Sequence, residues 1–333
     1  YNFDVPEGET LAPDESRVSE LEALMPEEPF HLGRPYSDRE AWEKVKNSPA
    51  GPMLLEAAED FIADDPMPYL TNELYVKTNE SQDRREVDQI IPRFRPRLNV
   101  LTVAECLEPN DRYLAQIEKD IQALFELKAW NFPLHPKGMQ FYRGEAEWVD
   151  LAVTHYGANL ITTFYLLGDR LSPELRKELR PQIERRILQP YERRLKTGKD
   201  VFWWMTCEHN WNSVCHSEIL ATALTLKETR REQAWFAAAV EKLLEYAEEG
   251  FAESGFYTEG VGYWGYGFSH HILGAELLSR VSQGKIDILK KPICEKISHF
   301  GSRMEIQDKV YPSFSDCDRS VRPPEWVRYW YNN

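Results

Sequence analysis

The sequence contains no apolar run long enough to cross a lipid bilayer, which excludes a membrane-spanning helix within it. Asp and Glu (55) outnumber Lys and Arg (40), and no segment forms a basic face dense enough for nucleic acid. No alternating run before Tyr311 predicts a sheet. None of the five cysteines forms a Cys-x-x-Cys pair, so their spacing resembles neither a zinc site nor a disulfide framework. They are Cys106, Cys207, Cys215, Cys294 and Cys317.

The composition is that of a folded protein with an acidic beginning. The 333 residues are enough for one large domain or two ordinary ones, and the 42% hydrophobic and 12% aromatic content supports a buried core. Residues 1–70 hold 17 acidic and five basic residues, and therefore carry most of the net charge of −15. Residues 1–37 are thus expected to form a solvated acidic arm, and the nearly balanced remainder permits an anionic substrate. The sequence leaves the oligomeric state open.

Apolar residues recur at helical spacing through most of the chain. Mostly apolar segments alternate with more charged ones, which favours an all-α fold of tandem helical hairpins that can close into a ring. Residues 66–109 mix Pro, Arg and Asn and are expected to form loop with short helices. The predicted helices lie at 18–24, 38–48, 52–65, 111–129, 145–168, 172–196, 211–227, 229–249, 261–281 and 286–305.

The segment His209-Asn210-Trp211-Asn212 places polar groups beside an indole at a predicted helix start, just after Trp203-Trp204. Aromatic rings stack on the apolar face of a sugar, and amide or imidazole groups bind its oxygens. The simplest alternative is that Asn210 or Asn212 only caps the helix. One cap does not account for all three polar residues, so the segment is a candidate carbohydrate site.

A second segment, Glu259 to Tyr266, combines glycines, which permit close backbone approach, with Tyr263, Trp264 and Tyr266. The simplest alternative is an aromatic core stripe, above all for Trp264. Tyr263 and Tyr266 share one face near a helix start, where the positive end of the helix dipole favours a phenolate. Tyr263 is therefore a candidate acid or base.

Together these residues resemble the heparinase II/III-like polysaccharide lyases, a group related to alginate and oligo-alginate lyases. The resemblance is carried by Asn210-Trp211-Asn212-x-Val214-Cys215 and by Gly255-Phe256-x-x-Glu259-Gly260-x-x-Tyr263-Trp264-x-Tyr266-Gly267, with Pro312-x-Phe314-x-Asp316 beyond them. It implies an incomplete (α/α) toroid at 38–310 and the start of a linker and β-sandwich domain at 311–333, most of which is missing from the chain. In that family the second domain supplies a further histidine and, in some members, a zinc, so no cofactor or metal ligand is predicted within this chain.

The resemblance also implies β-elimination on an acidic, uronic-acid-containing glycan of the glycosaminoglycan or alginate type. His209 and Asn210 are then expected to neutralise the uronate carboxylate and act as base, in an order left open, with Asn212 in support. Tyr263 is expected to protonate the leaving oxygen, with Tyr266 as the fallback. Because large acidic glycans are degraded outside the cytoplasm, a periplasmic or secreted location is expected.

Further substrate contacts are predicted around these residues. Glu259 is expected to hold its turn or orient a neighbour at the substrate, and Arg143 is a candidate cation for the polymer. Tyr266 is a further candidate for substrate binding. Four indoles are candidate stacking platforms: Trp203, Trp204, Trp211 and Trp264.

Two other functions fit the same residues. A glycoside hydrolase needs two carboxylates beside the bond, and Glu208 with Glu259 is the pair available. A non-catalytic glycan-binding module needs only the aromatic residues. A metal shared by His270 and His271 is not expected, because adjacent residues on a helix face different directions.

Overall fold

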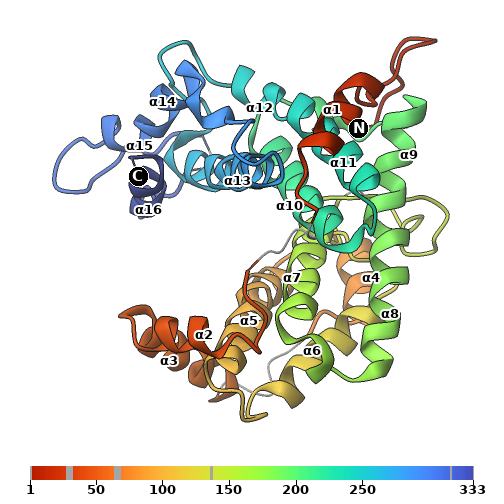
Figure 1. The fold of residues 1–333 in the computed structure, drawn as a ribbon, viewed down its shortest axis with the longest axis vertical. Coiled ribbons are helices and arrows are strands. Elements are labelled where there is room, and N and C mark those ends of the chain that lie inside the picture. Colours follow the sequence, from red (N-terminus) through yellow and green to blue (C-terminus); the bar gives the residue numbers. More distant parts are fainter. Residues whose placement is uncertain (1, 28–32, 64–68, 136–137, 316, 333) are drawn as a thin grey trace. The chain divides into compact units, whose positions relative to one another are not determined.

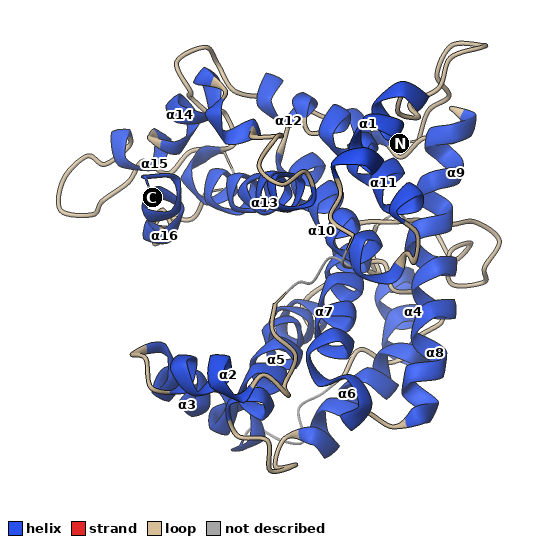
Figure 2. Cartoon of the chain, viewed as in Figure 1, coloured by secondary structure: helices blue, strands red, loops and turns tan. Residues whose placement is uncertain are grey.

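The computed structural model describes residues 2–27, 33–63, 69–135, 138–315 and 317–332 (Figure 1). Within these ranges the chain is helical, with isolated β-bridges and no strand (Figure 2). None of the described helices is both long and apolar enough to span a bilayer. The all-α class predicted from the sequence is therefore confirmed.

The chain divides into two compact units, each with its own internal contacts. Unit 1 comprises Tyr1–Phe30 and Glu192–Asn333, and unit 2 comprises His31–Tyr191. The division falls inside α9 (Gln189–Thr197). The predicted boundaries at residues 38 and 311 do not coincide with it.

Unit 2 is built from seven α-helices preceding α9 together with a short 3₁₀ turn and a π-helical turn, counted over its described residues. They are α2 (Arg39–Lys46), α3 (Ala50–Ala63), α4 (Asn72–Ser81), α5 (Val87–Leu107), α6 (Leu114–Glu126), α7 (Leu151–Leu167), the 3₁₀ turn Gly168–Arg170, α8 (Pro173–Ile183) and the π turn Glu184–Leu188.

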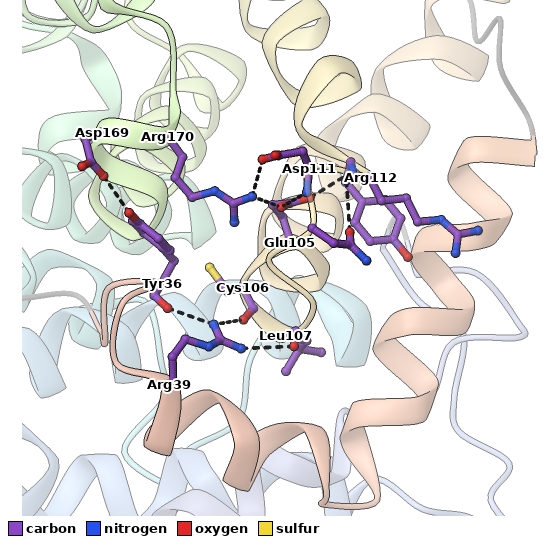
Figure 3. A network of polar contacts seen from close by, with 11 residues as sticks. Tyr36, Arg39, Glu105, Cys106, Leu107, Asp111, Arg112, Asp169 and Arg170 are labelled. Carbon is purple, nitrogen blue, oxygen red and sulfur yellow. Dashed lines mark hydrogen bonds and ion pairs between the residues drawn. The ribbon is translucent and has the colours of Figure 1, made fainter.

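A polar network closes one end of α5 in unit 2 (Figure 3). The Arg39 guanidinium donates to the carbonyls of Cys106 and Leu107 at 2.6 and 3.3 Å, where α5 ends and its carbonyls have no partner within the helix. The buried Glu105 carboxylate accepts from the backbone N–H of Asp111 at 2.9 Å and pairs with Arg170. These contacts fix the turn that leads from α5 to α6.

Unit 1 contains the segments that carry both sequence motifs. Its elements after α9 are the 3₁₀ turn Trp203–Thr206, α10 (Asn210–Leu226), α11 (Arg230–Leu243), α12 (Glu245–Glu249), α13 (Gly260–Val281), the 3₁₀ turn Ile288–Lys290, α14 (Pro292–Ser298), α15 (Phe300–Arg303) and α16 (Glu325–Asn332). The acidic arm contributes α1 (Glu15–Leu24), which packs on α11 (Figure 1).

Helix α10 lies at the centre of unit 1, packed against α11, α12 and α13. Nearly all of its residues are buried, including the polar Asn212, His216 and Glu218. A helix surrounded in this way buries its polar side chains too, and each of them then needs a hydrogen-bonding partner. The first motif thus begins a core helix of unit 1.

Two expectations about secondary structure are wrong. Within 66–109 the structure has α4 and the long helix α5, although α5 contains Pro92 and Pro96. Each proline removes one helical hydrogen bond, but Ile90, Phe94 and Leu98 form a buried stripe at four-residue spacing whose burial offsets that loss. Within 311–333, expected to be the start of a linker and β-sandwich domain, the described residues form loops and α16 in place of strands. Asp316 lies outside the described residues.

Candidate functional site

The starts of α10 and α13, from distant parts of the sequence, are joined by the carboxylate of Glu259. This carboxylate accepts from the backbone N–H of Asn210 at 3.1 Å and from the Asn210 Nδ2 at 3.0 and 3.1 Å. The hydroxyl of Tyr257 donates a further hydrogen bond to it. We call Tyr257, Glu259 and Asn210 the Glu259 cluster, and it is the polar junction between the two motifs.

The Glu259 cluster also completes the beginning of α10. The N-cap of α10 is His209, whose side chain makes no capping hydrogen bond. The first amides of a helix have no partner within it, and a carboxylate there is also favoured by the helix dipole. The alternative that Asn210 or Asn212 only caps this helix is therefore wrong, because the N-cap is His209 and the acceptor comes from Glu259, 49 residues further along.

Two glycines allow the helices to approach this closely. A Cβ at Gly267 in α13 would lie 2.9 Å from the Asn210 Cβ, closer than side chains permit. Gly260, the first residue of α13, has a φ of +88°, a left-handed conformation that favours glycine. The sequence motif therefore includes these glycines for packing and turn geometry.

The partly exposed Trp203 contacts both His209 and the partly exposed Trp211. The His209 ring centroid is 5.2 Å from that of Trp203, and Trp203 is in turn 5.0 Å from Trp211. Burial lowers the pKa of His209, an effect that the charge of Glu259 partly offsets. At neutral pH the imidazole is therefore uncharged and able to accept a proton. Its Nδ1 is buried and has no hydrogen-bonding partner among the described residues.

The predicted roles of the two asparagines need correction. Asn210 is 2% exposed and its amide nitrogen is committed to Glu259, so it is not free to neutralise a substrate carboxylate. Asn212 is fully buried and donates to the Met205 carbonyl at 3.0 Å, which holds the turn that carries Trp203. Both act as positioning residues, because burial has turned their donors inward.

Two of the four candidate stacking indoles belong to the core. Trp204 is fully buried and stacks on Phe202, with ring centroids 5.7 Å apart. Trp264 is 1% exposed and donates to the Ile297 carbonyl at 2.9 Å. Neither ring offers a face to a ligand in this structure, so the prediction fails for these two and stays open for Trp203 and Trp211.

The tyrosines and histidines of α13 divide between its faces. Tyr263 is partly buried against the core cluster that contains Trp264. Tyr266 makes an edge contact with His270, whose Nε2 is 3.4 Å from the Glu218 carboxylate. His271 instead faces Glu248, at the same distance. The prediction that the adjacent histidines face different directions is confirmed.

A small enclosed cavity of about 10 Å³ lies beside the Glu259 cluster, which is room for one water molecule. It is lined by His209, Asn210, Ser213, Tyr257 and His271, among others. The Asn210 Oδ1 is buried without a partner among the described residues, as is the His209 Nδ1. One water molecule would fit this volume beside the two polar atoms.

Arg143, the candidate cation for the polymer, lies in unit 2. It forms an exposed ion pair with Glu145, with contacts of 2.7 and 3.0 Å. For the candidate hydrolase pair, Glu208 is exposed while the carboxylate of Glu259 is occupied by its three donors.

Sequence reasoning missed Tyr257, the hydroxyl that completes the Glu259 cluster. Burial, reinforced by the charge of Glu259, raises the pKa of Tyr257, which keeps its hydroxyl protonated as a donor. The available signal was its position two residues before Glu259 in the glycine-bounded turn. No family model matches the chain, and no curated protein is significantly similar to it.

Proposed function

We propose that the chain is a polysaccharide lyase that cleaves uronic-acid-containing acidic glycans by β-elimination. One observation carries the proposal. A neutral, partly exposed imidazole, His209, sits beside Trp203 and next to Asn210, which the Glu259 carboxylate binds to the start of α13. Tyr263 lies one turn into that helix.

The two indoles supply the sugar contact. Trp203 and Trp211 are both partly exposed and adjacent, which suits stacking on the apolar face of a pyranose ring. Because the Asn210 amide is committed to Glu259, His209 is the member of the predicted pair that faces the substrate. The Glu259 cluster then holds the starts of α10 and α13 in fixed positions relative to each other.

The reaction needs one proton acceptor and one proton donor. His209 takes the C5 proton of the uronate, and the imidazolium so formed lies beside the enolate-like charge and stabilises it. The C4–C5 double bond forms as the C4–O4 bond breaks, and the Tyr263 hydroxyl gives its proton to O4. The imidazolium then returns a proton to the tyrosinate through solvent. In this proposal the helices of the chain belong to an incomplete (α/α) toroid, and the protein acts in the periplasm or after secretion.

The test is incubation of the chain with heparan sulfate, hyaluronan, chondroitin and alginate, with the ultraviolet absorbance of the unsaturated uronate as readout. We expect one of them to give signal, and Tyr263→Phe or His209→Gln to reduce the rate by about 10²–10⁴-fold, the usual contribution of a general acid or base. Tyr246→Phe, another partly buried tyrosine of unit 1, should leave the rate unchanged. Absence of signal with all four glycans contradicts the proposal.

The same experiment separates the two other functions. New reducing ends without unsaturation, lost in Glu259→Gln, would indicate a hydrolase. The engagement of Glu259 with Asn210 and Tyr257 argues against that role. Glycan binding that survives Tyr263→Phe without turnover would indicate a binding module.

A further inference from the structure

Three side chains with metal-binding atoms converge in unit 1, away from the two motifs in sequence. They come from three elements: Glu248 from α12, His271 from α13 and Cys294 from α14. The His271 Nε2 is 3.4 Å from a Glu248 oxygen and 4.0 Å from the Cys294 Sγ. All three ligand atoms lie within 4.8 Å of one another.

We propose that Glu248, His271 and Cys294 bind one zinc ion. Thiolate, imidazole and carboxylate together are a zinc donor set, and ligand atoms about 2.0–2.3 Å from a tetrahedral ion lie roughly 3–4 Å apart. The observed separations of 3.4 and 4.0 Å fit that geometry without rearrangement of the backbone. The inference is independent of the lyase proposal.

The cluster is built into the core of unit 1. His271 is 3% exposed and Cys294 is fully buried, while the Glu248 side chain is 10% exposed. Three protein ligands leave the fourth position of a tetrahedral ion to a water molecule.

Lys291 supplies the outer contact that a ligating carboxylate usually has. Its Nζ lies 2.9 Å from one oxygen of Glu248 and 3.1 Å from the other. When the ion takes the oxygen that faces His271, the other oxygen keeps its bond to Lys291. One thiolate and one carboxylate balance the dipositive ion.

Zinc binding requires the Cys294 thiol to lose its proton. Burial raises the pKa of the Cys294 thiol to about 12, so that without a metal it remains protonated. A zinc ion displaces that proton, and the protein releases it to solvent. The alternative is a hydrogen-bonded chain of Lys291, Glu248 and His271 without any ion.

The test uses Co²⁺ as a spectroscopic substitute for zinc in the whole chain. We expect one Co²⁺ per chain, displaced by Zn²⁺, with a thiolate-to-cobalt charge-transfer band and the visible bands of a tetrahedral site. Cys294→Ser should abolish the charge-transfer band. The matched control is Cys106→Ser in unit 2, whose thiol is equally buried with its pKa raised to about 12, and this variant should keep the band.

Further variants exclude a trivial loss of folding. His271→Gln should weaken Co²⁺ binding by at least 100-fold while the helical circular dichroism is retained. Lys291→Met removes the outer contact of Glu248 but none of the three ligands, and should keep the band. Absence of the band in the unmodified chain, or its persistence in Cys294→Ser, overturns the proposal. Uronate absorbance is read separately, so failure here leaves the lyase result unaffected.

Discussion

The most direct test of the structural argument is Glu259→Gln. Glutamine has nearly the same shape but keeps one acceptor oxygen and brings an amide nitrogen against the donors of Asn210 and Tyr257. Three hydrogen bonds to a charged acceptor are then reduced to one or two neutral ones. A hydrogen bond to a charged group contributes about 1.5–3 kcal/mol, and a buried donor left without a partner costs a further 1–3 kcal/mol.

From these contacts we expect the start of α10 to lose about 3 kcal/mol of local stability. Since 1.4 kcal/mol corresponds to a factor of ten, the local opening equilibrium should rise roughly 100-fold. Hydrogen exchange of the peptide covering residues 207–213 measures this opening directly. Because the readout is local, it does not depend on whether the two compact units unfold together.

A matched control and a double-mutant cycle sharpen the test. Thr229→Ala breaks the capping box of Thr229 and Glu232 on α11, and should leave exchange at 207–213 unchanged. Tyr257→Phe alone should accelerate exchange there, but should add little to Glu259→Gln because both remove the same hydrogen bond. Exchange in Glu259→Gln within threefold of the unmodified chain would refute the account of the Glu259 cluster.

Three further predictions concern buried charges. Burial lowers the pKa of His216, which is hydrogen-bonded to the Met205 carbonyl, to about 4. The free energy of unfolding of unit 1 should therefore fall by about 3 kcal/mol as the pH falls from about 6.5 to 4. In urea unfolding, His216→Gln should reduce this pH dependence. Burial raises the pKa of Asp150 to about 7, so the free energy of unfolding of unit 2 should fall by up to about 4 kcal/mol as the pH rises from about 4 to 7. Asp150→Asn should remove that pH dependence. The prediction is contradicted if the stabilities of both units change with pH in the same direction. Asp120→Asn should destabilise unit 2 by about 3–5 kcal/mol in the same assay, because it removes the charge from a fully buried ion pair with Arg97. A loss under 1 kcal/mol would contradict this prediction.

Local sequence patterns predicted the helices well where apolar spacing was regular. The stretches predicted at 211–227 and 261–281 match α10 and α13 to within a residue. They failed at α5, because two prolines are a strong local signal against a helix while the burial that outweighs them comes from helices elsewhere in the chain. The helix α16 was missed for another reason, because the expectation for residues 311–333 came from the family resemblance and not from local patterns.

Part of the candidate site, too, could be predicted from the sequence, and part could not. Its residue types and the pairing of the two motifs could be recognised in the sequence. The sequence could not show which side chains face inward, since the neighbours Trp203 and Trp204 differ: Trp203 is partly exposed and Trp204 is fully buried. The proposed zinc site could not be recognised in the sequence either, because Glu248, His271 and Cys294 follow one another at intervals of 23 residues and form no local motif.

The sequence by itself determined the helical class, the positions of most helices and the two segments rich in aromatic and polar residues, because these depend on spacing between near neighbours. Only the tertiary structure decided that Glu259 completes the start of α10, that Asn210 and Asn212 hold backbone and carboxylate groups, and that Trp264 is a core residue. Hydrogen bonds and burial are set by which helices pack together, and two glycines in α13 allow that packing at the distance observed.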